Sequence, residues 1–150
     1  MVINGAILAR RGGMNQPSEA TKSVLVVEDE QSIRDILVEL FEIEGNVVTA
    51  AELLPHALEK LRSQRFDLVI TDLRLGGKRD GGLQVMALAG MLSPDATVLV
   101  LTAYPDDSNR QASFRLGALH FLEKPVDLAT IAQYAASAGV RTAFAGAAKA

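Results

Sequence analysis

The hydrophobic positions of this chain fall into five short continuous runs, separated by segments in which apolar residues recur at helical spacing. Runs of about four to six mostly apolar, β-branched residues are typical of strands buried on both faces of a sheet. They predict strands at 24–27, 46–50, 67–71, 96–101 and 119–122. Strands that alternate with helices predict an α/β fold: a doubly wound, five-stranded parallel sheet with five helices on its two faces.

Helix boundaries are predicted from residues that begin or end a helix. Pro55 suits the first turn of the second helix, and Pro94 closes the third. Gly45 and Gly117 follow the first and fourth helices as stops. We expect a last helix from Asp127 that continues to residue 140.

The last helix carries no charged residue between Leu128 and Val140. A helix that covers a sheet normally has charges on its solvent face. We assign one stripe to the core: Leu128, Ile131, Ala135 and Ala138. The opposite side is then expected to present Ala129, Gln133, Ala136 and Val140, with Tyr134 nearby, as a contact surface for a possible homodimer or a partner.

The 150 residues suit one domain with tails. We expect a flexible leader at 1–22, a domain at 23–140 and a C-terminal tail or helix extension at 141–150. The absence of cysteine excludes disulfides and thiolate chemistry, and two histidines leave little for a zinc site. With a net charge of −3, no basic run and no membrane-length apolar segment, we expect a cytoplasmic protein without direct nucleic-acid or membrane binding.

Polar residues follow four of the predicted strands. Glu28, Asp29 and Glu30 follow the first, Asp72 the third, Thr102 the fourth and Lys124 the fifth. The carboxyl ends of parallel strands meet at one edge, where ligands bind. Clustered carboxylates repel unless a cation lies among them, and Mg²⁺ prefers oxygen ligands, often completed by phosphate. This edge therefore predicts phosphoryl chemistry, with Asp72 as the attacking carboxylate that becomes an aspartyl phosphate.

Four segments together resemble the motifs of a response-regulator receiver domain. They are Val26–Glu30 (VVEDE), Asp67–Leu75 (DLVITDLRL), Leu101–Ala103 (LTA) and Phe121–Pro125 (FLEKP). The resemblance covers roughly residues 23–140 and implies the flavodoxin-like receiver topology. It also implies a phosphorylation-dependent switch of a two-component or phosphorelay system.

Carried over position by position, the resemblance implies Asp72 as phosphoacceptor and Mg²⁺ as cofactor. Asp29 would bind the metal directly and Glu28 through water, with the backbone carbonyl of Arg74 as the third protein ligand. The family often has Asp where Glu28 stands. Glu30 is interpreted instead as a solvated helix-start residue.

The remaining motif positions imply a phosphate site and a switch. Thr102 and Lys124 would bind the phosphoryl group, and Thr102 and Phe121 would transmit its presence, although Phe121 suits a core position equally well. The Lys124–Pro125 peptide is expected to be cis. Arg74 and Tyr104 should flank the path of water to the acyl phosphate and so set its lifetime.

One departure from the family pattern lies in the loop 76–82. The family usually has proline and glycine four and five residues after the phosphoacceptor. This chain has GGKRDGG there, about two residues longer. The start of the third helix is therefore open.

The function expected is that of a switch rather than an enzyme with a separate substrate. It would accept phosphoryl from a sensor-kinase histidine or a phosphotransfer protein and signal through altered protein contacts. It would act as a stand-alone regulator or relay intermediate, or as a receiver cut from a larger regulator or hybrid kinase.

Two other classes of protein share features with the expected receiver switch. A haloacid dehalogenase-type phosphatase also uses an aspartyl phosphate, but Arg74 stands where its acid/base Asp is needed. A flavodoxin-like flavin module needs a phosphate loop after the first strand, and the three acids at Glu28–Glu30 would repel that phosphate.

Overall fold

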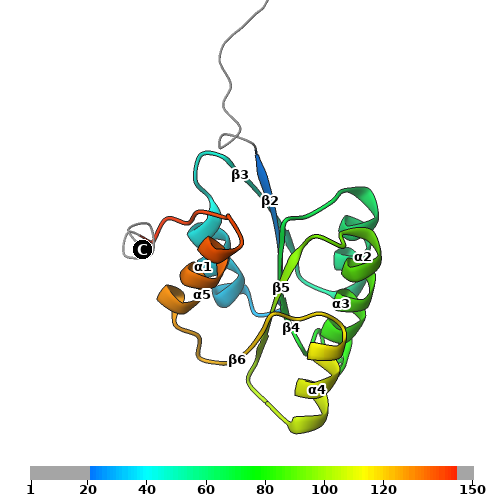
Figure 1. Ribbon diagram of the computed structural model, residues 1–150. Coiled ribbons are helices and arrows are strands. Elements are labelled where there is room, and N and C mark those ends of the chain that lie inside the picture. Colours follow the sequence, from blue (N-terminus) through cyan, green and yellow to red (C-terminus); the bar gives the residue numbers. More distant parts are fainter. Residues whose placement is uncertain (1–20, 145–150) are drawn as a thin grey trace, which may run out of the picture.

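The computed structural model describes residues 21–144, which form alternating strands and helices (Figure 1). The strands are β2 (Lys22–Val27), β3 (Asn46–Ala51), β4 (Leu68–Asp72), β5 (Thr97–Thr102) and β6 (His120–Glu123). The helices are α1 (Gln31–Phe41), α2 (Leu54–Ser63), α3 (Gly81–Leu92), α4 (Asp107–Arg115) and α5 (Leu128–Ser137).

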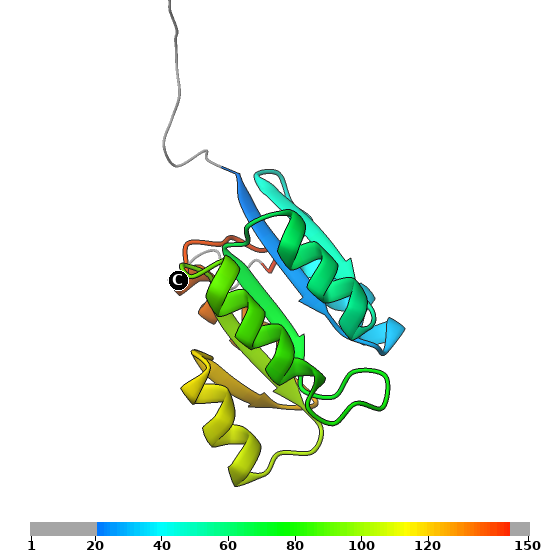
Figure 2. The same cartoon turned by 90° about the vertical axis from the view of Figure 1, so that its right-hand side faces the viewer.

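The sheet has the strand order β3-β2-β4-β5-β6, and every neighbouring pair is parallel. Helices α1 and α5 cover one face, and α2, α3 and α4 cover the other, as Figures 1 and 2 show. This confirms the predicted doubly wound sheet of five parallel strands and five helices. From β2 the chain adds β3 on one side of the sheet and β4, β5 and β6 on the other, so the direction of winding changes between β2 and β4. In sheets of this kind, a crevice lies at the carboxyl ends of the two strands where the direction changes.

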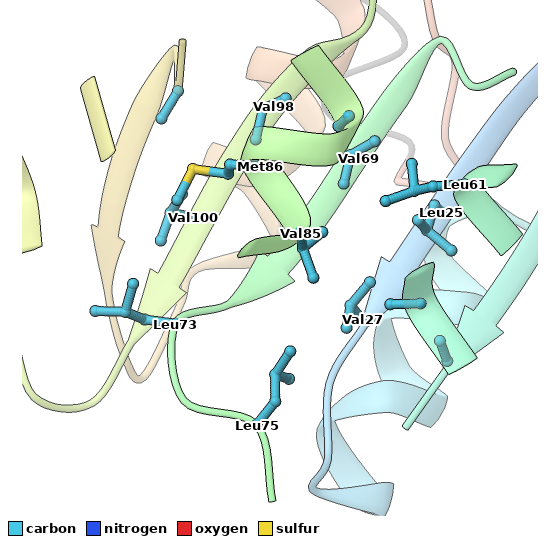
Figure 3. Packing of buried hydrophobic residues seen from close by; sticks show 14 of the residues in the cluster. Leu25, Val27, Leu61, Val69, Leu73, Leu75, Val85, Met86, Val98 and Val100 are labelled. Carbon is cyan, nitrogen blue, oxygen red and sulfur yellow. The ribbon is translucent and has the colours of Figure 1, made fainter. Parts of the chain in front are cut away.

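Each face of the sheet has its own hydrophobic core, because alternate side chains of a strand point to opposite faces. Val24, Val26 and Leu68 point toward α1 and α5, whereas Leu25, Val27 and Val69 point toward α2 and α3. Figure 3 shows the second of these cores, where Met86 and Val85 of α3 meet the central strands. The central strands are thus buried on both sides, as their continuous apolar runs predict.

The loop between β4 and α3 contains a tight turn closed by backbone hydrogen bonds. Leu75 and Lys78 exchange backbone hydrogen bonds, and α3 begins at Gly81 after the N-cap residue Asp80. Gly82 lies against the end of β4, where its N–H donates to the carbonyl of Leu73 at 2.8 Å. Helix α3 therefore starts two residues before Leu83, the first apolar residue that indicated it.

The prediction that the last helix reaches residue 140 is wrong. Helix α5 ends at Ser137, and Gly139, with φ +83°, turns the chain back toward the domain. Val140 is completely buried in the core under α1 and α5, so it is not part of an exposed face. Ile131 and Ala135 are buried as expected, and Gln133 and Ala136 are exposed.

The predicted segment boundaries shift slightly in the structure. Lys22 already belongs to β2, so the strand begins inside the range assigned to the leader. Residues 141–144 are not helical, and the N–H of Ala143 donates to the carbonyl of Leu40 at 2.8 Å. The rest of the expected leader and tail, at 1–20 and 145–150, lies outside the described residues.

Gly82 offers a test of the packing between α3 and the end of β4. A Cβ there would lie 2.3 Å from the carbonyl oxygen of Asp72 and 2.7 Å from Leu73 Cα, both backbone atoms. We expect Gly82→Ala to lower the free energy of unfolding by about 1–3 kcal/mol in urea titrations. Gly90→Ala is the control, because a Cβ on Gly90 meets nothing within 4 Å and should stabilise α3 by about 0.5–1 kcal/mol. Equal stabilities for the two variants would contradict the close approach.

Candidate functional site

The residues predicted to share one edge of the sheet are brought together there. Strand pairing sets Val27 beside Thr71, Asp72 beside Leu101, and Thr102 beside Glu123. Each functional side chain therefore sits at or directly after the end of its strand.

Lys124 connects the acids of this edge. Its Nζ lies 2.8 Å from Glu28 Oε1 and 3.0 Å from Asp72 Oδ2. Glu28 is completely buried and Asp72 is 6% exposed, so both ion pairs are largely shielded from water. The Lys124–Pro125 peptide that follows is cis, as predicted.

Glu28, Asp29 and Asp72 form a cluster in which one carboxylate oxygen from each lies within 4.8 Å of the others. One ammonium group cannot neutralise three carboxylates, so the cluster keeps a surplus of negative charge. An all-oxygen donor set with surplus negative charge fits a hard divalent cation such as Mg²⁺. Glu30 is not part of this cluster but lines the pocket beside it: it is exposed, and its N–H donates to Glu28 Oε2 at 3.1 Å.

The electrostatics of the cluster reflect its burial. Desolvation raises the pKa of Glu28 to about 7, with a smaller rise from the nearby charge of Asp72, while the contact with Lys124 opposes it. Burial by itself would lower the pKa of Lys124, but its contacts with Glu28 and Asp72 outweigh that effect and raise it. Lys124 therefore stays charged, whereas burial favours the protonated form of Glu28.

Two supporting contacts were not predicted from the sequence. The guanidinium of Arg34 in α1 donates to the backbone carbonyl of Glu28 at 2.9 Å. The N–H of Gly76 donates to Asp29 Oδ2 at 3.0 Å. Both contacts use a backbone group on one side, which side-chain patterns do not reveal.

A pocket of about 300 Å³ opens beside Asp72. Arg74 and Tyr104 line it together, and the Arg74 guanidinium stacks over the Tyr104 ring at 4.3 Å from the ring centre. Tyr104 is 61% exposed, so this pair lies at the mouth of the pocket. The structure therefore places both residues where they were expected to flank the approach to Asp72. The role of the Arg74 carbonyl as a metal ligand stays a prediction.

Thr102 and Phe121 differ in their surroundings. The Thr102 hydroxyl lines the pocket and accepts a hydrogen bond from the N–H of Tyr104 at 3.0 Å. Phe121 is 9% exposed and belongs to the core on the face covered by α2, α3 and α4, with the Arg110 guanidinium of α4 5.6 Å from its ring centre. Phe121 thus occupies a core position in this structure.

The fold and the acid cluster define a class of protein: a doubly wound α/β domain with a cluster of carboxylates at the carboxyl edge of its sheet. The family model for the response regulator receiver domain matches residues 24–136. The chain therefore belongs to the receiver domain family of two-component response regulators. This membership decides against the phosphatase and flavin-module alternatives.

Curated relatives agree with this membership. The sporulation initiation phosphotransferase F of Bacillus subtilis is 31% identical over 107 residues, which cover 71% of this chain and 85% of that protein. The alginate biosynthesis transcriptional regulatory protein AlgB of Pseudomonas aeruginosa is 35% identical over 112 residues, which cover 75% of this chain and 24% of that protein. The chain thus spans about a quarter of the length of AlgB.

Solved structures give the same result. A response regulator from Burkholderia pseudomallei with a phosphorylated aspartic acid, a calcium ion and citrate has a TM-score of 0.67 and 30% identity, covering 85% of this chain and 69% of that one. A CheY-like receiver domain from Methanospirillum hungatei has a TM-score of 0.73 and 25% identity, covering 80% and 94%.

The raised pKa of Glu28 predicts a pH-dependent stability in the absence of divalent cations. The folded chain keeps a proton that the unfolded chain releases near its ordinary pKa of 4.5, so stability should fall as pH rises from about 4.5 to 7. We expect urea titrations in a chelator to show a loss of about 1–3 kcal/mol that Glu28→Gln lacks. Added Mg²⁺ should reduce the loss in the wild type. The same pH profile in both proteins would contradict the assignment.

Proposed function

We propose that Asp72 accepts a phosphoryl group from the phosphohistidine of a sensor kinase or phosphotransfer protein. The main support for this proposal is the position of the Asp72 carboxylate. It lies at the end of β4, 3.0 Å from the Lys124 ammonium and within the acid cluster. The phosphorylated aspartic acid and calcium ion of the Burkholderia relative support an acceptor and a cation site of this kind. The physiological cation proposed here is Mg²⁺.

In the proposed step, an oxygen of Asp72 forms a bond to phosphorus while the donor's N–P bond breaks and the imidazole leaves with that electron pair. Lys124 offsets charge on the phosphoryl oxygens, as does the Thr102 hydroxyl, which lines the same pocket. Glu28, Asp29, Asp72 and the carbonyl of Arg74 would hold the Mg²⁺, which supplies further charge neutralisation when bound. Because the chain acts on its own carboxylate, we propose a switch and no separate substrate.

Signalling then follows from a shift between two packings of the same chain. The Thr102 hydroxyl, which now accepts from the Tyr104 N–H, would turn to the phosphoryl group, and the packing of Phe121 would respond. Phe121 is already buried, so the change we propose is a tightening around its ring rather than a swing from solvent.

The setting proposed for this switch is cytoplasmic, with signalling through protein contacts and without direct nucleic-acid binding. Among the helices of residues 21–144, none is long and apolar enough to span a bilayer. The relatives include a phosphotransferase of similar length and a transcriptional regulator about three times as long. Both a relay protein and one domain of a larger regulator are therefore supported contexts.

The acceptor is tested by intact mass after incubation with Mg²⁺ and acetyl phosphate. The wild type should gain about 80 Da, one phosphoryl group, and Asp72→Asn should not. An unchanged wild-type mass with several small donors and with a phosphorylated kinase would contradict the proposal.

The stacked pair at the pocket mouth predicts the lifetime of the phosphorylated state. Tyr104→Ala should shorten the half-life by about twofold or more, because the ring and the guanidinium held on it obstruct the in-line path of water. Tyr134→Ala is the control, since Tyr134 stacks on His120 and does not line this pocket. A half-life in Tyr104→Ala equal to or longer than the wild type would refute this role.

The exposed side of α5 remains the proposed self-association surface, without Val140. One relative was solved as a beryllofluoride-activated receiver domain dimer, NtrC4, with 30% identity and a TM-score of 0.69. We expect light scattering to show a dimer at least for the phosphorylated wild type and a monomer for Gln133→Glu combined with Ala136→Glu. Ala87→Glu places a charge on the exposed side of α3 and should leave the dimer intact. A wild type that is monomeric in both states would exclude self-association here.

A further inference from the structure

The turn at residues 75–78 is a closed structural element. Leu75 and Lys78 exchange two backbone hydrogen bonds, at 3.1 and 3.0 Å, and the two residues between them have positive φ, +56° at Gly76 and +84° at Gly77. A two-residue hairpin turn of type I′ requires positive φ at both central residues, and glycine adopts positive φ without steric penalty. The double glycine therefore fixes the shape of this turn.

The N–H of Gly76 lies inside the turn but donates to a residue outside it, Asp29. The hairpin hydrogen bonds involve only Leu75 and Lys78, so the N–H of Gly76 is not consumed by the turn. It donates instead to Asp29 Oδ2 at 3.0 Å. A hydrogen bond to an ionised acceptor is stronger than one between neutral groups. One oxygen of Asp29 is thus held, while its carboxylate stays within the cluster with Glu28 and Asp72.

The turn is also anchored to the core. The side chain of Leu75 is 1% exposed and belongs to the cluster under α2 and α3. A Cβ on Gly81 would lie 3.0 Å from Leu75 Cβ, so α3 packs directly against the base of the turn. Gly76 cannot move away from Asp29 without disturbing buried residues.

We propose that the Gly76 amide is a positioning group for Asp29, and that the order of this turn and the binding of a divalent cation are coupled. The inference rests on the cation site of the proposed function. An acid whose free oxygen is already oriented binds a cation more tightly, and loss of such an outer contact typically costs about 10–100-fold in metal affinity. By reciprocity, cation binding must stabilise the amide contact by the same factor.

The contact is particular to this chain's sequence. Gly76 stands four residues after Asp72, where the resemblance to the family implies a proline. Proline has no N–H and holds φ near −65°, so it could neither donate to Asp29 nor form this turn. The longer glycine loop therefore supplies a contact that the usual residue would preclude.

Two neighbouring glycines make a matched pair for the test. Alanine at Gly76 would carry left-handed strain and place its Cβ 2.6 Å from Leu53 Cδ2, so either the Leu53 side chain or the turn that carries the amide must shift. Alanine at Gly77 carries the same kind of strain but meets nothing within 4 Å. By calorimetric titration with Mg²⁺, we expect Gly76→Ala to raise the Kd about tenfold and Gly77→Ala by about twofold or less. Thermal unfolding of both variants checks that they fold.

The hydrogen bond between Gly76 and Asp29 can be tested directly by measuring the exchange of the Gly76 N–H with solvent by NMR. In a chelator, the Gly76 N–H should exchange several-fold faster in Asp29→Ala than in the wild type, because its acceptor is gone. Adding Mg²⁺ to the wild type should slow the same exchange further.

The outcomes separate this inference from the proposed function. If the wild type binds Mg²⁺ but Gly76→Ala and Gly77→Ala weaken it equally, the positioning role is overturned and the cation site stands. If neither Asp29→Ala nor Mg²⁺ changes the exchange rate of the Gly76 N–H, the hydrogen bond between Gly76 and Asp29 is contradicted. If the wild type binds no Mg²⁺, both the coupling and the proposed cation site fail, whereas phosphorylation of Asp72 is judged separately by mass.

Discussion

The ion pairs of Lys124 with Glu28 and Asp72 are the interactions on which this site depends. Two carboxylates at the end of a buried sheet are costly unless a cation lies between them, and one ammonium group lies within 3.0 Å of both. It cannot also neutralise Asp29, so the cluster keeps a surplus of negative charge. Burial, and to a smaller extent the charge of Asp72, raises the pKa of Glu28 in this cluster. A site of this kind favours cations and, once a cation is present, an incoming phosphoryl group.

The parallel sheet makes this cluster possible because it delivers every strand to the same edge. Val27 pairs with Thr71 and Asp72 with Leu101, so residues far apart in the chain meet without any long loop. Burial of the strands on both faces fixes their register, since a slip would expose apolar side chains. The positions of the acids are thus set by the packing of the core.

This dependence explains what the sequence could predict. Glu28, Asp72, Thr102 and Lys124 each end a recognisable apolar run, so their meeting follows from topology alone. The end of α5 was predicted wrongly because the apolar period continues to residue 140, although the positive φ of Gly139 turns the chain and buries its last member. The contact with Asp29 involves a backbone N–H, and a backbone group leaves no mark in a pattern of side chains.

The exposed parts of the site lie at its rim. Arg74 and Tyr104 are exposed and touch each other across the pocket mouth, and the turn that contacts Asp29 is exposed at Gly76. Substitutions there leave Asp72 and Lys124 in place because those two residues are held by strand register and buried ion pairs. Access of water to the pocket can therefore change without displacing Asp72 or Lys124. Under the proposed function, an acceptor carboxylate in a fixed position and a variable pocket mouth would give one fold different lifetimes of the phosphorylated state.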